Sequence, residues 1–278
     1  MTRRNFNTLQ PVVKWVGGKR QLLSEIKPLI PEEYGKYCEP FIGGGAVLFS
    51  EKPNSAIVND SNSELINLYK TIRDNVEELI VELGTHENKA EHFYSVREWD
   101  RAEEYGERTA IEKAARLLFL NKTCYNGLYR VNNAGEFNSP FGRYKNPNIV
   151  NDIALRAMSK YFNKSDIAIL NGDFEDVLSK LEKNDFVYID PPYDAVSSTS
   201  SFTGYTENGF GKESQRRLRA FCSVLNDKEI KFMLSNSDTE FINGLYEGFT
   251  IRTIQAKRSI NSRANGRGNV NEVLVTNY

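Results

Sequence analysis

The residues best suited to chemistry form the tetrapeptide DPPY, residues 190–193. It follows an apolar run typical of a buried strand, DFVYI at 185–189. Its two prolines cannot donate backbone hydrogen bonds, so they end strand pairing and hold the chain stiff and extended. On this platform the Asp190 carboxylate and a proline carbonyl can accept from the amine of a flat ring, and Tyr193 can stack on its face. A Pro-Pro turn alone gives no reason for the acid and the tyrosine.

A second candidate site is the glycine-rich segment EPFIGGGA, residues 39–46, where a strand is expected to end and a helix to begin. In open α/β sheets, ligands approach the carboxyl ends of strands, and glycine lets the backbone come close to them. Neither the P-loop ending G-K-[ST] nor the dinucleotide pattern G-x-G-x-x-G is present. A tight strand-to-helix turn without a ligand explains the glycines equally well.

Acidic residues follow the next two expected strands. Asp60 comes directly after the apolar run at 56–59, where it can accept hydrogen bonds from ribose hydroxyls or cap the following helix. Asp173 and Phe174 follow the third strand. They can offer an acceptor and an aromatic wall to an adenine, although such a pair is more often a helix cap and a core side chain.

The elements that must position these residues alternate between short β-rich runs and helical periodicity. This pattern predicts an α/β fold with an open, largely parallel sheet. The expected strands are 37–41, 56–59, 166–170, 185–189 and 231–235, and the expected helices are 19–29, 46–50, 173–182 and 213–226. Residues 250–258 and 271–278 are expected to form an antiparallel pair at the sheet edge.

The stretch between Asn59 and Asp166 is far longer than the ~12 to 30 residues that a strand-to-strand crossover needs. Its sequence is helical at 63–83, 91–103 and 109–122, and then aromatic, Asn-rich and Gly-rich at 123–148. We therefore expect an inserted, mainly helical domain at 63–150. The catalytic domain would comprise residues 1–62 and 151–278.

Composition excludes several classes of protein. The chain has 278 residues, 40% of them hydrophobic, which is enough for a sizeable core. Its 36 basic residues against 37 acidic ones exclude a uniformly basic coat for nucleic acid. Basic residues nevertheless gather at 1–20, 113–145 and 252–267, and these islands can form one cationic face for a phosphate backbone. An unevenly charged solvated surface explains them about as well.

The remaining composition argues against a metal centre and a membrane protein. Cys38, Cys124 and Cys222 are widely spaced and are assigned to packing, and His86 and His92 are assigned to the solvated surface. No metal site is predicted. Because there is no apolar leader and no apolar run of 18 residues, we expect a soluble, cytoplasmic protein without a membrane partner.

Three motifs together resemble the Dam-type DNA adenine-N6 methyltransferases (D12 class, alpha group), which act on GATC. They are KWVGGK at 14–19, F-x-G-x-G at 41–45 and DPPY at 190–193. The resemblance continues through LNKTCYNGLYRVN at 120–132 and FNSPFGRYKNP at 137–147. It implies a Rossmann-like sheet that binds S-adenosylmethionine (AdoMet), with an inserted recognition domain that carries a β-hairpin.

The resemblance implies AdoMet as methyl donor and double-stranded DNA as partner. With the glycine turn and the acids described above, the expected cofactor-binding residues are Trp15, Lys19, Phe41, Gly43, Gly45, Asp60, Asp173, Phe174 and Asp190. The expected catalytic residues are Asp190, Pro191, Pro192 and Tyr193. The N6 lone pair of adenine is delocalised and a poor nucleophile, so we expect the site to work by alignment. The adenine must first be flipped out of the duplex.

Sequence recognition is expected in the insert, where residues 128–137 predict a β-hairpin. Period two places Leu128, Arg130 and Asn132 on one face of a ribbon that fits the major groove. Arg130 can read a guanine edge, and Leu128 or Pro140 a thymine methyl. The resemblance makes Tyr125 a wedge in the base stack. The remaining expected DNA contacts are Lys14, Asn126 and Tyr144.

Two loops are expected to assist. Arg263 and Arg267, within 260–268, can clamp phosphates, and residues 202–205 can cover the flipped base. The residues also leave two alternatives open: an RNA adenine-N6 methyltransferase, and a catalytically silent DNA-binding protein of the same fold. A ribbon carrying Arg130 favours duplex DNA, because A-form RNA hides its major groove. A cognate restriction endonuclease is a candidate functional partner.

Overall fold

The computed structural model describes residues 9–195, 210–257 and 269–278. The expected lid at 202–205 and the expected phosphate clamp of Arg263 and Arg267 lie outside the described residues.

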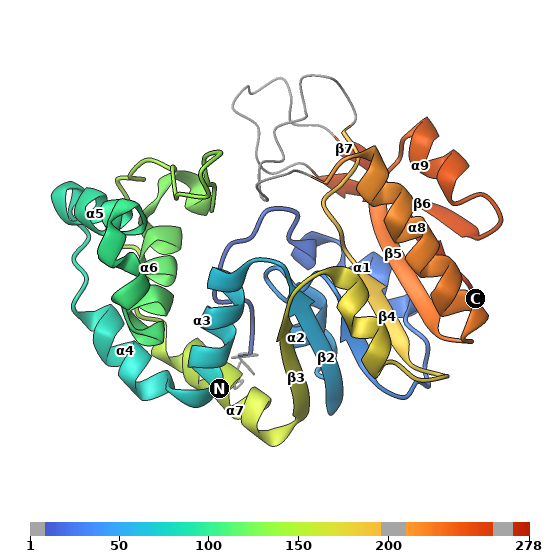
Figure 1. The fold of residues 1–278 in the computed structure, drawn as a ribbon, viewed down its shortest axis with the longest axis horizontal. Coiled ribbons are helices and arrows are strands. Elements are labelled where there is room, and N and C mark those ends of the chain that lie inside the picture. Colours follow the sequence, from blue (N-terminus) through green and yellow to red (C-terminus); the bar gives the residue numbers. More distant parts are fainter. Residues whose placement is uncertain (1–8, 196–209, 258–268) are drawn as a thin grey trace, which may run out of the picture.

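The centre of the molecule is a seven-stranded sheet of order β3-β2-β1-β4-β5-β7-β6 (Figure 1). Its strands are β1 Tyr37–Glu39, β2 Ser55–Asp60, β3 Asp166–Asn171, β4 Phe186–Ile189, β5 Lys231–Ser237, β6 Thr250–Lys257 and β7 Asn269–Thr276. The pairs among β1 to β5 are parallel, and β7 runs antiparallel to both β5 and β6. The predicted α/β class and the C-terminal antiparallel pair are confirmed.

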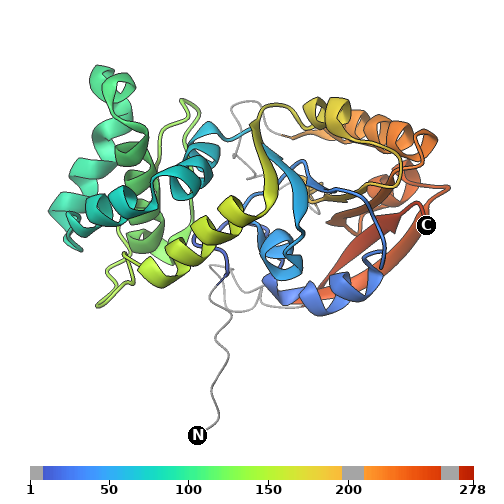
Figure 2. The ribbon, with the colours of Figure 1, turned by 90° about the horizontal axis from the view of Figure 1, so that it is seen from below.

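Strand β4 shows why the sheet forms. All four of its residues are buried, because helices cover both faces (Figure 2). Phe186 and Tyr188 join the apolar cluster beneath α2 and α3, while Val187 and Ile189 join the cluster beneath α8 and α9. This alternation follows from the period of two in a strand. A continuous apolar run, rather than an alternating one, is therefore the signature of these strands.

The helices divide between the sheet and the insert. The α-helices are α1 Leu23–Ile26, α2 Ala46–Glu51, α3 Ser63–Asp74, α4 Val76–Gly84, α5 Ala90–Arg97, α6 Ala110–Thr123, α7 Asp152–Lys164, α8 Lys212–Asp227 and α9 Glu240–Leu245. The 3₁₀ helices are η1 Lys19–Gln21, η2 Lys27–Leu29, η3 Glu98–Arg101, η4 Glu103–Glu107, η5 Tyr125–Gly127 and η6 Phe174–Lys180. Figure 1 shows α4, α5 and α6 standing beside the sheet, with α3 and α7 between them and β2 and β3.

Two helix predictions need correction. The continuous helix expected at 19–29 is three short pieces, η1, α1 and η2, and Pro28 occupies the start of the last of them. Proline fixes φ and removes an N–H donor, which favours such a break. The helix expected at 173–182 is the 3₁₀ helix η6, whose N-cap is Asp173.

The β-hairpin expected at 128–137 is present only in reduced form. An isolated bridge joins Val131 and Phe137, and the Asn132 N–H donates to the Glu136 carbonyl at 2.9 Å. The Asn132 side chain competes for the strand geometry, because its Oδ1 accepts from the N–H groups of Ala134 and Glu136, each at 3.0 Å. Asparagine commonly stabilises turns in this way.

The three cysteines are buried and free, as predicted. The prediction that His86 is solvated is wrong: it is 8% exposed and stacks on Phe119, with ring centroids 4.6 Å apart. Its Nδ1 lies 2.9 Å from Nε2 of His92. Burial, and then the charge of His92, lower the pKa of His86 to about 4. The acidic composition of this segment hid an apolar helix face that packs on α6.

Candidate active site

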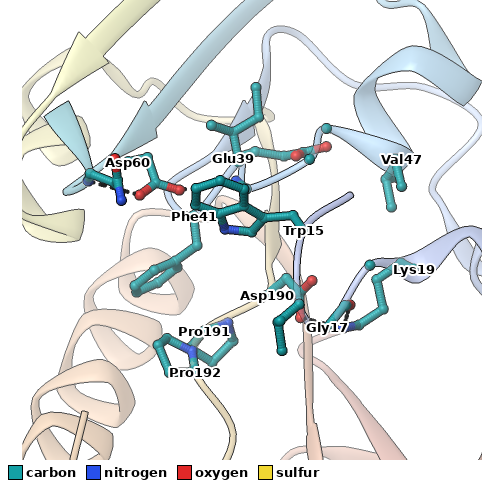
Figure 3. Close-up of a pocket in the computed structure, with 18 of the residues that line it drawn as sticks. Trp15, Gly17, Lys19, Glu39, Phe41, Val47, Asp60, Asp190, Pro191 and Pro192 are labelled. Atoms are coloured by element: carbon teal, nitrogen blue, oxygen red, sulfur yellow. Dashed lines mark hydrogen bonds and ion pairs between the residues drawn. The ribbon is translucent and has the colours of Figure 1, made fainter. Parts of the chain in front are cut away.

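A cavity of about 280 Å³ lies at the carboxyl ends of β1, β2 and β4. Figure 3 shows labelled side chains from separate segments meeting around it. Among the predicted site residues, those that line the cavity are Trp15, Lys19, Phe41, Gly43, Gly45, Asp60, Asp190, Pro191, Pro192 and Tyr193. The structure therefore brings together the three motifs, although DPPY lies more than a hundred residues beyond the other two in the sequence.

The glycine turn is shaped by a tryptophan. Gly43 and Gly45 have φ of +46° and +69°, in the region that favours glycine. A Cβ on Gly43 would lie 2.9 Å from Cδ1 of Trp15, and one on Gly45 would lie 2.6 Å from Cε2 of Phe49. Close packing of the protein on itself thus already requires these glycines, and the indole becomes part of the cavity wall.

Asp60 holds the turn from the neighbouring strand. Its carboxylate accepts from the N–H of Gly43 at 3.0 Å and from the N–H of Asn62 at 2.9 Å. Burial raises the pKa of Asp60, and these two backbone hydrogen bonds oppose the rise. Helix α3 is capped by Asn62, whose Oδ1 accepts from the Leu65 N–H at 2.9 Å. The helix-cap role considered for Asp60 therefore belongs to Asn62, and Asp60 lines the cavity.

Asp190 forms an ion pair with Lys19 that the sequence motifs do not predict. The Lys19 Nζ lies 2.8 Å from Asp190 Oδ1, and the Ser235 hydroxyl donates to the same oxygen at 3.0 Å. Lys19 is 4% exposed and the Asp190 side chain 22%. Burial raises the pKa of Asp190, while Lys19 and Ser235 oppose the rise. Within the described part of the chain these hydrogen bonds fall on Oδ1, so Oδ2 can accept from a ligand.

The DPPY segment is also held from behind. The Tyr193 hydroxyl donates to Glu272 Oε2 at 2.7 Å, and Lys19 Nζ lies 4.6 Å from the centre of the Tyr193 ring. The Pro192 carbonyl accepts from the amide of Gln215 on α8 at 2.9 Å. Glu272 and Gln215 were not predicted. Both lie next to other polar residues, in strand β7 and helix α8, and no local pattern distinguishes them from these neighbours.

Glu39 lies in the predicted segment 39–46, although the sequence indicates no role for its carboxyl group, and it is 2% exposed and lines the cavity. Its Oε1 accepts from the Tyr37 hydroxyl at 2.5 Å and from the Leu48 N–H at 2.8 Å. Burial raises the pKa of Glu39 to about 8. This carboxyl group therefore adds little negative charge to the cavity at neutral pH.

Asp173 and Phe174 do not line the cavity. Asp173 accepts from the Glu175 N–H at 3.0 Å as the cap of η6 and pairs with Arg217 at 3.0 Å. Phe174 stacks behind Phe41, with ring centroids 5.3 Å apart. The structure thus gives this dipeptide the cap and core positions, and Phe174 supports the cavity wall from behind.

A groove of about 830 Å³ adjoins the cavity. Among its lining residues are Lys14, Asn126 and Leu128, three of the expected DNA contacts. Lys122 and Arg20 line it as well. Burial, and then the charges of Lys14 and Arg20, lower the pKa of Lys122. With Lys19, four basic residues therefore line the groove, although the net charge of the chain is close to zero.

The other expected DNA contacts differ in their solvent exposure and in their hydrogen bonds within the protein. Tyr125 is 59% exposed and Tyr144 is 37% exposed. Arg130 is exposed, with its Nε 2.7 Å from Asn138 Oδ1. Pro140 is exposed, whereas the Asn132 side chain donates to the Glu136 carboxylate and accepts from the Ala134 N–H within the turn. Arg130 of the reduced hairpin and Pro140 just beyond it are thus exposed, whereas the Asn132 side chain is bonded within the turn.

An α/β sheet of this order, with a cavity at the carboxyl ends of its parallel strands, is a methyltransferase fold. The family described as D12 class N6 adenine-specific DNA methyltransferase matches residues 15–260. The chain belongs to this family and is an adenine-specific DNA methyltransferase. The family predicted from the three motifs is confirmed.

Relatives of nearly the same length support this assignment. A Lactococcus lactis subsp. cremoris protein named type II methyltransferase M1.LlaDCHI is 44% identical over 280 residues, which cover 100% of this chain and 99% of the relative. The type II methyltransferase M.MjaIII of Methanocaldococcus jannaschii is 42% identical, covering 97% and 99%. A protein of Haemophilus influenzae named DNA adenine methylase is 32% identical, covering 96% and 93%.

In the described residues, no helix is both long and apolar enough to cross a bilayer. The described histidines, cysteines and acids likewise form no group of three or more suited to a metal ion.

Proposed function

We propose that this enzyme transfers the methyl group of AdoMet to N6 of an adenine that is flipped out of duplex DNA, with GATC as the expected target. One observation carries the proposal: Tyr193 of the DPPY segment lines both the cavity and the groove. A base that enters from the groove would thus meet a donor held in the cavity at this segment.

The donor set of the cavity fits AdoMet. Asp60 offers carboxylate oxygens at the end of β2, where ribose hydroxyls are commonly held. Trp15 and Phe41 supply flat apolar surface, and Asp190 supplies negative charge beside them. Trp15, Lys19, Asp60 and Asp190 would hold the cofactor. When bound, AdoMet supplies an electrophilic methyl group on a sulfonium.

The chain's own residues have to align the amine. Asp190 and the Pro191 carbonyl would accept the two N6 hydrogens, turn the lone pair toward the methyl group and stabilise the positive charge that develops on nitrogen. Lys19 favours the ionised form of Asp190. Asp190 need not be a strong base, because a methylated ammonium loses its proton readily. The Tyr193 ring, held by Glu272, would replace the stacking that the base loses on flipping.

The helical insert, residues 63–150, is proposed as the target-recognition domain. Tyr125 is 59% exposed, more than Tyr94 or Tyr144 of the same domain, and would fill the space that the adenine leaves. Arg130 would read a guanine edge, and Leu128 or Pro140 a thymine methyl. Lys14, Asn126 and Tyr144 would make further contacts with the same stretch of DNA.

A biological setting is suggested by the relatives' names. Two full-length relatives are named type II methyltransferases. We therefore propose that this enzyme protects DNA from a restriction endonuclease that cleaves the same sequence.

The decisive experiment incubates the enzyme with methyl-labelled AdoMet and plasmid DNA, and then maps the modified base and its neighbours. Label on adenine N6 at one recurring sequence supports the proposal. Label on cytosine, on structured RNA in preference to duplex DNA, or on no nucleic acid contradicts it. A recurring sequence other than GATC would leave the chemistry intact and replace the target.

A further inference from the structure

The segment at residues 15–19 is a wall shared by two sites. Each of its five residues lines both the cavity and the groove. Lys14, directly before it, lines the groove. A ligand on one side would therefore lie against the same short segment of the chain as a ligand on the other. That these two ligands are AdoMet in the cavity and DNA in the groove rests on the proposed function.

Asn121, on helix α6 of the insert, clamps this segment. Its Oδ1 accepts from the Lys14 N–H at 2.9 Å, and its Nδ2 donates to the Lys14 carbonyl at 2.9 Å. The same Nδ2 donates to the Gly127 carbonyl at 3.1 Å. Asn121 is 2% exposed, so these bonds replace water and are costly to leave unmade. One amide thus ties the cofactor segment to the turn that carries Tyr125 and Asn126.

Two close contacts strengthen the same connection. The Trp15 indole stacks on Tyr129, with centroids 4.9 Å apart and planes inclined by 21°. Tyr129 belongs to the insert and is 7% exposed. A Cβ on Gly127 would lie 2.6 Å from Cδ of Lys14. A shift of either segment would therefore change its contacts with the other.

We propose that Asn121 is a positioning residue that couples cofactor binding to recognition of the DNA sequence. A cofactor that fixes Trp15 and Lys19 would also fix Lys14 and the turn at Tyr125–Gly127. Such coupling is reciprocal, so cognate DNA tightens cofactor binding by the factor by which the cofactor tightens binding of cognate DNA.

The coupling is measured with S-adenosylhomocysteine, which lacks the methyl group and permits no turnover. Its Kd is determined by calorimetry for the full-length enzyme alone, with a duplex containing the mapped target, and with a scrambled duplex. We expect the target duplex to lower the Kd at least about fivefold and the scrambled duplex to leave it within twofold. Equal Kd values in all three cases overturn the inference, whereas no binding at all contradicts the proposed function.

A second experiment removes the hydrogen bonds that Asn121 donates. Asn121→Asp keeps the shape and the acceptor but loses both donated bonds, and it should bring the Kd ratio to within twofold of one. Thr123→Val is the matched control, because this buried hydroxyl donates to the Phe119 carbonyl of its own helix α6 and, among the described residues, makes no other hydrogen bond. It should keep the wild-type ratio. Retention of the ratio in Asn121→Asp, or equal loss in the control, overturns the assignment.

A second pair of variants tests the stacking contact between Tyr129 and Trp15. Tyr129→Leu removes the stack on Trp15 and should weaken the coupling, while Tyr129→Phe keeps the ring and should restore it. Hydrogen exchange of the unmodified enzyme needs no variant: S-adenosylhomocysteine should slow exchange at Lys14 and within Tyr125–Leu128. Protection that is confined to the cavity residues would overturn the inference even if every variant failed to fold.

Discussion

The cavity and the proposed recognition face around Tyr125 and Arg130 hold their charged and aromatic side chains in opposite ways. In the cavity, Asp190, Lys19 and Tyr193 are each fixed by partners from other strands. On the recognition face, Tyr125 is 59% exposed and Arg130 is exposed. The difference indicates where each part gains its precision: the chemical site is organised by the fold, whereas the reading residues would acquire most of their contacts from DNA.

The largest effect is expected from Asp190→Ala. Removing the carboxylate takes away an acceptor for the amine and a partner of Lys19, so we expect kcat to fall by at least about 10³-fold. Binding of the target duplex should change little, because Asp190 belongs to the cavity. Single-turnover methylation and a gel-shift titration measure the two quantities. Asp74→Ala, at an exposed acid bound to Arg73, is the control, and a variant as active as the wild type would disprove the role.

Lys19→Met should give the next largest effect, about 10- to 100-fold in kcat at pH 7. Burial raises the pKa of Asp190 and Lys19 lowers it, so loss of Lys19 raises that pKa further. Activity that needs the ionised carboxylate is lost as the pH falls through this value. The acidic limb of the pH–rate profile should therefore move to higher pH in the variant. An unmoved limb with a uniformly lower rate would assign Lys19 to binding alone.

On the recognition face, Arg130→Ala should reduce discrimination at one guanine by about 1 to 3 kcal/mol, with little change in kcat on the target itself. The measurement is kcat/KM on the mapped site and on sites with each base replaced. If the loss is instead uniform over all sequences, Arg130 contacts phosphate, and the contrast between reading and catalysis weakens.

Asn138→Ala should give the smallest effect. Its Oδ1 accepts from Arg130 Nε at 2.7 Å, which orients the guanidinium before DNA arrives. Losing one such hydrogen bond should cost about 0.5 to 1.5 kcal/mol, at the same base pair as Arg130→Ala. The double variant should be no worse than Arg130→Ala alone. Additive losses would show that Asn138 acts independently of the arginine.

The sequence predicted those parts of the site whose residues lie next to one another. DPPY and the glycine turn each follow a strand, Asp60 ends one, and parallel strands bring their carboxyl ends to one edge. The partners of these residues could not be predicted. Glu272 and Asn121 act on residues 79 and 107 positions away, so only the folded chain shows their roles. Local signals also misled where a proline or an asparagine competed with the regular element, as at 19–29 and 128–137.

Strand β7 lies between β5 and β6 although it follows both in the chain. While the polypeptide emerges from a ribosome, β6 therefore has no neighbour in the sheet until β7 is inserted beside it. The same strand brings Glu272 to Tyr193. A nascent chain that has not yet reached β7 thus lacks both the complete sheet and the hydrogen bond that holds Tyr193. Methyltransferase activity should therefore arise late in synthesis.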